Sequence, residues 1–231
     1  EKFLQENTNT LPAEDISLWK ANGRVIDQDV VAEVNVPGFR RSAMDGYAVR
    51  GEDTFGASQY DPVGLTVVGE SFPGRPLKGV SLKSNEAVKI MTGAPVPDGC
   101  NAVVPAEVCE INNNSIMVSE AVPPFKNLGE IGEDVSSGDL VLEAGRKLRP
   151  QDVGVLASIG ISSVRCVLRP RVQLVITGDE LLPPGSRPEG PFIVDSNSIV
   201  LSSLVERDGG DLQPFGILPD RVDVIRREFQ N

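Results

Sequence analysis

Short apolar runs with alternating polar positions dominate the middle of the chain and predict a β-rich region from about residue 39 to 134. Residues 65–68, 87–91 and 102–104 have the length and composition of strands. Three asparagines at 112–114 separate two further runs and predict a hairpin, because asparagine tolerates the positive φ of tight turns. Glycine and proline interrupt the rest at close intervals. This pattern favours a small β barrel or sandwich.

The flanking segments differ from this region in their periodicity. Residues 1–35 are predicted to be partly helical, with a helix that begins at Asp15 or Ser17 and ends at Gly23. Residues 140–142 and 163–168 predict strands, and Pro150 predicts the first turn of a helix that ends near Gly160. We therefore expect residues 1–38 and 135–168 to form one discontinuous, elongated domain, which the β-rich domain of residues 39–134 interrupts.

The pattern after residue 168 is that of an α/β protein. Residues 172–176 form a nearly continuous apolar run, as expected for a strand covered on both faces. Capping residues at 195–198 precede a helical pattern that two glycines at 209–210 end. A second strand is expected near residues 212–218, followed by a helix that Asp220 caps. Residues 169–231 are thus interpreted as the start of a parallel α/β domain, which needs more than two strands to be complete.

Composition narrows the chemistry that is available. The formal net charge of −11 argues against nucleic acid and anionic membranes as partners, and no apolar run is long enough to span a membrane. Three cysteines without CxxC spacing indicate reduced thiols in a cytoplasmic protein. The absence of histidine excludes Ser-His-Asp and Cys-His catalysis and the common zinc sites. Carboxylates, hydroxyls, lysines, backbone dipoles or a hard ion such as Mg²⁺ remain.

Several acidic residues stand where strands end or begin. Asp45 lies at a loop-to-strand junction, where a rigidly held carboxylate can face a ligand, although a lone Asp-Gly is more often only a turn. Asp179 and Glu180 follow the apolar run that ends at residue 176, and ligands of open α/β sheets bind beyond such strand ends. A polar loop is an equal alternative there. Asp220 also follows a predicted strand. A role in a functional site and a role as the N-cap of the last helix are equal alternatives for it.

Two further motifs carry weaker signals. Thr92 follows a strand and enters a Gly/Pro turn, where its hydroxyl and N–H could both contact an anion, and a structural turn is the default alternative. Asp134 lies in an acidic patch that is ordinarily solvated surface, with divalent-metal binding as the alternative. Neither a P-loop nor a dinucleotide-binding fingerprint is present in the sequence.

Four blocks of the sequence resemble the molybdenum insertases, the family of bacterial MoeA and the gephyrin E domain. They are VPGFRRSAMDGYAVR, IMTGAPVPDGCNAVVPAE, GEDVSSGDLVLEAG, and VITGDELLPPG followed by IVDSNS. They occur in the family's order and approximate spacing, and the first block resembles bacterial members. The resemblance implies a multi-domain α/β plus β fold: a discontinuous N-terminal linker domain, an inserted β barrel-like domain, and an incomplete three-layer α/β domain that binds molybdopterin.

The resemblance also implies an activity and a set of site residues. The family inserts molybdenum from molybdate into adenylated molybdopterin and releases AMP, in a Mg²⁺-dependent step of molybdenum cofactor biosynthesis. The implied catalytic and metal-binding residues are Asp45, Glu180 and Asp220. The implied contacts to the pterin substrate come from Thr92, Asp134, Thr177, Gly178 and Asp179.

The assembly implied by the resemblance is an elongated homodimer. Its cleft lies between the α/β domain of one subunit and the β domain of the other, and molybdopterin adenylyltransferase is the expected donor of the substrate. Family members continue past this point with further loops and a C-terminal β domain, so the chain by itself is expected to be inactive as an insertase. The alternative is a non-catalytic dimeric scaffold or binding module of the same fold, as in the gephyrin branch.

Overall fold

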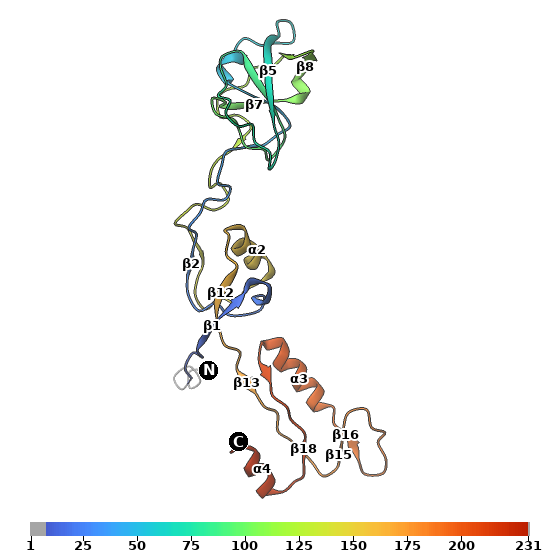
Figure 1. Cartoon of the computed structure of the whole chain (residues 1–231). Coiled ribbons are helices and arrows are strands. Elements are labelled where there is room, and N and C mark those ends of the chain that lie inside the picture. Colours follow the sequence, from blue (N-terminus) through green and yellow to red (C-terminus); the bar gives the residue numbers. More distant parts are fainter. Residues whose placement is uncertain (1–7, 231) are drawn as a thin grey trace. The chain divides into compact units, whose positions relative to one another are not determined.

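The computed structural model describes residues 8–230 (Figure 1). Its internal contacts divide the chain into two compact units. The β unit is Val31–Val141, and the α/β unit combines Glu1–Val30 with Leu142–Asn231. Residues 1–7 and residue 231, which belong to the predicted domains 1–38 and 169–231, lie outside the described residues. The finer division into three domains stays a prediction.

The β unit is built on a six-stranded sheet with the order β7-β4-β6-β5-β9-β8. Its strands are β4 (Gly46–Val49), β5 (Val63–Ser71), β6 (Glu86–Ile90), β7 (Ala102–Pro105), β8 (Cys109–Asn112) and β9 (Ser115–Val118). Strands β5 and β6 are parallel, and the other neighbours are antiparallel. The sheet curls into a half barrel, which confirms the predicted β-rich character of this region.

The predicted asparagine hairpin is present between β8 and β9. Asn112 pairs with Ser115, and Asn113 has a φ of 53°, the left-handed conformation that asparagine tolerates. The remaining elements of this unit are short: β3 (Arg41–Ser42) pairs with β10 (Leu128–Gly129), and the 3₁₀ turns are η2 (Gly51–Thr54) and η3 (Ala106–Val108). β2 (Val30–Val31) pairs with β11 (Leu140–Leu142), which confirms the strand predicted at 140–142.

Strand β4 is buried along its whole length because both of its faces are covered. Tyr47 and Val49 join one apolar cluster together with Leu65, whereas Ala48 joins a second cluster with Val88. Successive side chains of a strand point to opposite faces, so two clusters on a single sheet require apolar residues at consecutive positions. The sequence of β4 meets this requirement and fixes the strand between β6 and β7.

The first part of the α/β unit pairs the two ends of its discontinuous segment. β1 (Ala13–Ser17) runs antiparallel to β12 (Ser163–Val167), and η1 (Leu18–Lys20) follows directly. The predicted helix beginning at Asp15 or Ser17 is therefore wrong, because β12 supplies the backbone partners for a strand. Gly23 has a φ of 76°, but η1 ends earlier, with Ala21 as its C-cap residue.

Helix α2 (Pro150–Ser158) begins at Pro150 as predicted, and its first turn is fixed by a buried carboxylate. Asp152 accepts hydrogen bonds from the Arg149 N–H at 2.9 Å and from the guanidinium groups of Arg149 and Arg146. The Arg149 side chain is the main reason why the pKa of Asp152 lies far below its usual range. The last turn leads to Gly160, whose φ is 84°.

The second part of the α/β unit contains three pairs of very short parallel strands. β13 (Arg171–Val172) pairs with β17 (Asp211–Leu212), β14 (Ile176–Thr177) with β18 (Ile217–Leu218), and β15 (Leu181–Leu182) with β16 (Ile193–Val194). The parallel arrangement confirms the prediction, but a continuous strand over 172–176 does not form. Pro214 has no N–H to donate, and the offset between paired residues changes from 40 to 41 across this segment, so the ladder is interrupted.

Two helices complete this part, α3 (Asn197–Asp208) and α4 (Val222–Glu228). The Oδ1 atom of Asp195 accepts the Ser198 N–H at 3.0 Å, and Gly209 ends α3 with a φ of 93°, both as predicted. The predicted cap by Asp220 is wrong: Arg221 is the N-cap residue of α4, and no side chain caps that helix. Within residues 8–230, no helix is both long and apolar enough to cross a membrane.

The two-sided core of the β unit gives a direct stability prediction. Leu65 is 1% exposed and packs in the larger cluster, whereas Val68 on the same strand is 36% exposed. We expect Leu65→Ala to lower the free energy of unfolding by about 3 kcal/mol, through lost burial and a residual cavity. Val68→Ala is the matched control, with an expected change below about 0.5 kcal/mol. Urea unfolding followed by circular dichroism measures both, and equal effects would contradict the assignment of the core.

Candidate active site

Asp45 and Thr92 form a direct hydrogen-bonded pair at one end of the β unit's sheet. The Thr92 N–H and the Thr92 hydroxyl both donate to Oδ1 of Asp45, each at 2.8 Å. These bonds, the backbone one first, hold the pKa of Asp45 below its usual range, because they stabilise the ionised carboxylate. The Oδ2 atom accepts no hydrogen bond from residues 8–230, and Asp45 as a whole is exposed.

The register of the sheet explains why these two residues meet. Gly46 pairs with Ile90 across β4 and β6, so the residue before Gly46 and the residues after Ile90 leave the sheet at the same end. Gly46 is needed because a Cβ atom there would lie 2.0 Å from the carbonyl oxygen of Val104. Glycine at this position therefore lets β7 approach closely beside the site carboxylate.

The turn that carries Thr92 is fixed by its own backbone hydrogen bonds. Gly93 has a φ of 79° and donates its N–H to the Ser42 carbonyl at 2.8 Å. Ser42 in turn donates its N–H to Ala94 at 3.0 Å. The hydroxyl and the N–H of Thr92, which we expected to contact an anion, both donate to Asp45. We infer that Thr92 positions this carboxylate.

Arg41 is a site residue for which the sequence alone gave no role. It lines a cavity of about 290 Å³ together with Thr92 and Glu133. Its guanidinium donates to Glu133, with an Nε to Oε1 distance of 3.0 Å, and lies 3.4 Å from Oδ2 of Asp134. The bond to Glu133 raises the pKa of Arg41. Arg41 therefore links Asp134 to the region of Thr92. In the sequence, only the position of Arg41 four residues before Asp45 indicated that this arginine could lie near the candidate site.

The remaining predicted residues lie at the carboxyl ends of two paired parallel strands. Thr177 is the last residue of β14, and Gly178 donates its N–H to Leu218 of β18 at 3.2 Å. Asp179 accepts the backbone N–H of Asp220 at 3.3 Å. Glu180 follows directly and is exposed. The structure thus brings Asp179, Glu180 and Asp220 onto neighbouring loops of the α/β unit, as the parallel arrangement requires.

The carboxylates of Asp45, Glu180 and Asp220 are the kind of ligand that Mg²⁺ prefers, but there are few of them. Asp45 belongs to the β unit, whereas Glu180 and Asp220 belong to the α/β unit. Among residues 8–230, no group of three acidic, cysteine or histidine side chains lies close enough to hold a metal ion. Mg²⁺ commonly keeps several waters and is bound by one or two carboxylates plus substrate phosphates. Within the α/β unit, Glu180 and Asp220 are two carboxylates of the kind that such a site uses.

Comparison with known sequences places the chain in a family. Residues 1–160 match the family described as MoeA N-terminal region (domain I and II). The molybdopterin molybdenumtransferase of Haemophilus influenzae is 37% identical over 99% of this chain and 55% of its own length. Molybdopterin molybdenumtransferase 2 of Mycobacterium tuberculosis is 39% identical over 90% of this chain and 54% of its own length. The chain spans about half the length of these curated relatives.

Comparison with solved structures agrees with this result. The crystal structure of the molybdopterin biosynthesis moeA protein from Pyrococcus horikoshii matches this chain with a TM-score of 0.89 and 39% sequence identity. The match covers 99% of this chain and 61% of the Pyrococcus chain. A further sequence relative, gephyrin from Dictyostelium discoideum, is 32% identical over 92% of this chain and 32% of its own length. The chain belongs to the MoeA family.

The Thr92–Asp45 pair gives a prediction about pH. The pKa of Asp45 is lowered first by the N–H of Thr92 and then by its hydroxyl. Thr92→Val removes only the hydroxyl, so it is expected to raise that pKa partway toward its usual value. The carboxylate would then protonate at a higher pH than in the unmodified protein. NMR titration of the Asp45 carboxyl carbon measures this shift.

Thr92→Ser is the matched control for this titration. Serine keeps the hydroxyl and the backbone N–H, so the low pKa of Asp45 should be retained. The positioning role of Thr92 would be refuted by equal pKa values for Asp45 in the valine variant and the unmodified protein.

Proposed function

We propose that the protein acts in molybdenum cofactor biosynthesis, by inserting molybdenum from molybdate into adenylated molybdopterin with release of AMP. The observation that carries this proposal is the exposed, ionised Asp45 carboxylate held by both donors of Thr92. It lies in the sequence block through which the chain resembles the insertases. Relatives named molybdopterin molybdenumtransferase support the same reaction.

The charges of the reactants explain why carboxylates would serve this reaction. Adenylated molybdopterin carries a diphosphate linkage and molybdate is an anion, so acidic side chains alone would repel both. We propose that Asp45, Glu180 and Asp220 hold Mg²⁺, directly or through water. When bound, this ion would neutralise charge on the diphosphate. The contribution of the chain is to orient the reactants and to keep Asp45 ionised.

The state of the thiols is consistent with this proposal. Burial raises the pKa of Cys100 to about 12 and that of Cys109 to about 11, so both are protonated at neutral pH. Thiolates are the form in which cysteines bind metals. We therefore propose that the sulfur ligands of molybdenum come from the dithiolene of the substrate, and that these two cysteines are structural.

An assay of AMP release tests the proposed reaction. The complete gene product is incubated with adenylated molybdopterin, molybdate and Mg²⁺, and AMP release is expected. Asp45→Asn should reduce the rate at least about a hundredfold, because the anionic oxygen is lost while the shape is kept. Asp61→Asn, at an exposed aspartate of the same unit, is the control and should leave the rate unchanged.

The results of this assay separate the candidate functions. Absence of AMP release from a folded, complete gene product would end the enzyme proposal and favour a binding or scaffold module. We propose that the 231-residue chain alone has little or no activity, since its relatives are about twice as long. Full activity from the 231-residue chain would contradict that part of the proposal.

We further propose that the protein works as a homodimer in the cytoplasm and receives its substrate from molybdopterin adenylyltransferase. In this proposal Asp45 of one copy serves the same cleft as Glu180 and Asp220 of the other copy. Light scattering coupled to size-exclusion chromatography is expected to give twice the mass of the chain for the complete gene product. A single-chain mass at micromolar concentration would contradict the shared cleft.

A further inference from the structure

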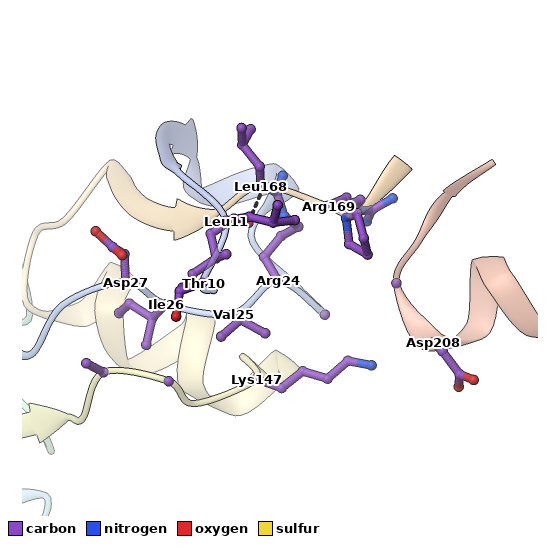
Figure 2. A pocket seen from close by; sticks show the side chains of 16 residues that line it. Thr10, Leu11, Arg24, Val25, Ile26, Asp27, Lys147, Leu168, Arg169 and Asp208 are labelled. Carbon is purple, nitrogen blue, oxygen red and sulfur yellow. Dashed lines mark hydrogen bonds between the residues drawn. The ribbon is translucent and has the colours of Figure 1, made fainter. Parts of the chain in front are cut away.

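A second cavity lies in the α/β unit, away from the residues proposed for the reaction. Its volume is about 730 Å³, which is within the range of small-molecule sites. Three cationic side chains line it: Arg24, Lys147 and Arg169. Figure 2 shows Lys147 extended into the open space on the side of Arg169 and Asp208. Asp179, Glu180 and Asp220 do not line this cavity.

The acidic residues of the lining are already paired with arginines that lie outside it. Asp27 accepts a hydrogen bond from Arg165 at 3.2 Å. Asp208 accepts two from Arg207, at 2.8 and 2.9 Å. These pairs leave the carboxylates less available to a cationic ligand.

Lys147 and Arg169, in contrast, form no ion pair with any residue in the range 8–230. Lys147 has only a longer-range electrostatic interaction with Asp208. Two cations without a close partner are notable in a chain whose net charge is −11. The cavity is therefore a locally positive region of an acidic protein, which favours an anionic ligand.

Arg24 is the most buried of the three cations that line the cavity. Its side chain is 10% exposed, and one end of the guanidinium donates to Glu14 at 2.8 Å and to the Val167 carbonyl at 2.9 Å. The Nε–H of Arg24 is buried and has no acceptor among the described residues. A buried donor without an acceptor is costly, but this atom exposes almost no surface, so the charged contacts to a ligand are left to Lys147 and Arg169.

The rest of the lining is apolar. Leu11 is 40% exposed and Leu168 is 38% exposed, and both line the cavity together with Pro170. Exposed apolar side chains beside cations suit a ligand that combines an anionic head with a flat, apolar body. A bare inorganic anion would leave these side chains in water.

We propose that this cavity binds a small phosphate ester, with its phosphate between Lys147 and Arg169 and its apolar body against Leu11 and Leu168. Phosphate offers several acceptor oxygens, which suits a guanidinium and an ammonium group that line one cavity. A cavity of about 730 Å³ has the size of a small-molecule site. This site is separate from the proposed insertase reaction and does not depend on it.

Calorimetric titration of the 231-residue chain with phenyl phosphate tests the proposal. At low ionic strength we expect a dissociation constant of about 1 mM or lower. Inorganic phosphate should bind at least about threefold more weakly, because it lacks the ring that contacts Leu11 and Leu168. Binding should weaken as salt approaches about 0.15 M, since the contacts are ionic and partly exposed.

Substitutions locate the site. The double variant Lys147→Gln/Arg169→Gln should bind phenyl phosphate at least about tenfold more weakly. Both side chains are exposed, so folding should be preserved. Lys20→Gln/Arg187→Gln removes the same charge from exposed positions outside the cavity and should change binding by less than about twofold. Leu168→Ala should weaken phenyl phosphate but not inorganic phosphate.

The amide signals of Gly23, Gly145 and Gly209, which line the cavity, provide a second readout by NMR. They should shift on titration in the unmodified chain and stay unchanged in the double variant. Three results would each overturn the proposal: no binding of phenyl phosphate at millimolar concentration, equal losses in the two double variants, or a ring that adds nothing to the affinity of phosphate.

Discussion

Burial of β4 on both faces is the constraint on which the candidate site depends. Tyr47 and Val49 are anchored in one apolar cluster and Ala48 in another, so the strand has no freedom to slide or rotate. The close approach of β7 at Gly46 fixes its end. Asp45 follows directly from this anchored strand and therefore has a defined position even though its side chain is exposed. The carboxylate is held by the core beneath it as much as by Thr92.

Charged side chains are arranged differently in three regions of the molecule. Around Asp45 and Arg41, acids and cations are interleaved, and the hydrogen bonds there favour ionised carboxylates. Around Lys147 and Arg169, two cations stand without close partners inside an acidic protein. The buried cluster at Asp152 is a third case, in which two arginines surround one carboxylate and fix the start of α2. In this last case the carboxylate is fully compensated within the chain, and the two arginines leave one positive charge in excess.

Elements whose signals are local were predictable. The asparagine hairpin, the proline at the start of α2 and the glycine after α3 each act through the conformation of one or two residues. Two of the failures share one cause, which is a distant partner. β12 converts residues 13–17 into a strand, and Pro214 interrupts the ladder opposite residues 172–176. Neither effect can be read from the segment that it changes.

The family blocks, the β-rich middle region and the parallel order of the last segment were all predictable from the sequence. So were the positions of Asp45, Thr92, Glu180 and Asp220 at the ends of strands. The contacts that these residues make depend on the three-dimensional fold. The pairing of Gly46 with Ile90 directs both donors of Thr92 at Asp45. The pairing of Arg41 with Gly129 in β3 and β10 places Arg41 beside Asp134. In the α/β unit, the tertiary structure gathers Arg24, Lys147 and Arg169 around one cavity. The physical reason is that hydrogen bonds and charge pairs act over a few ångströms in space, and sheet register decides which distant residues come within that range.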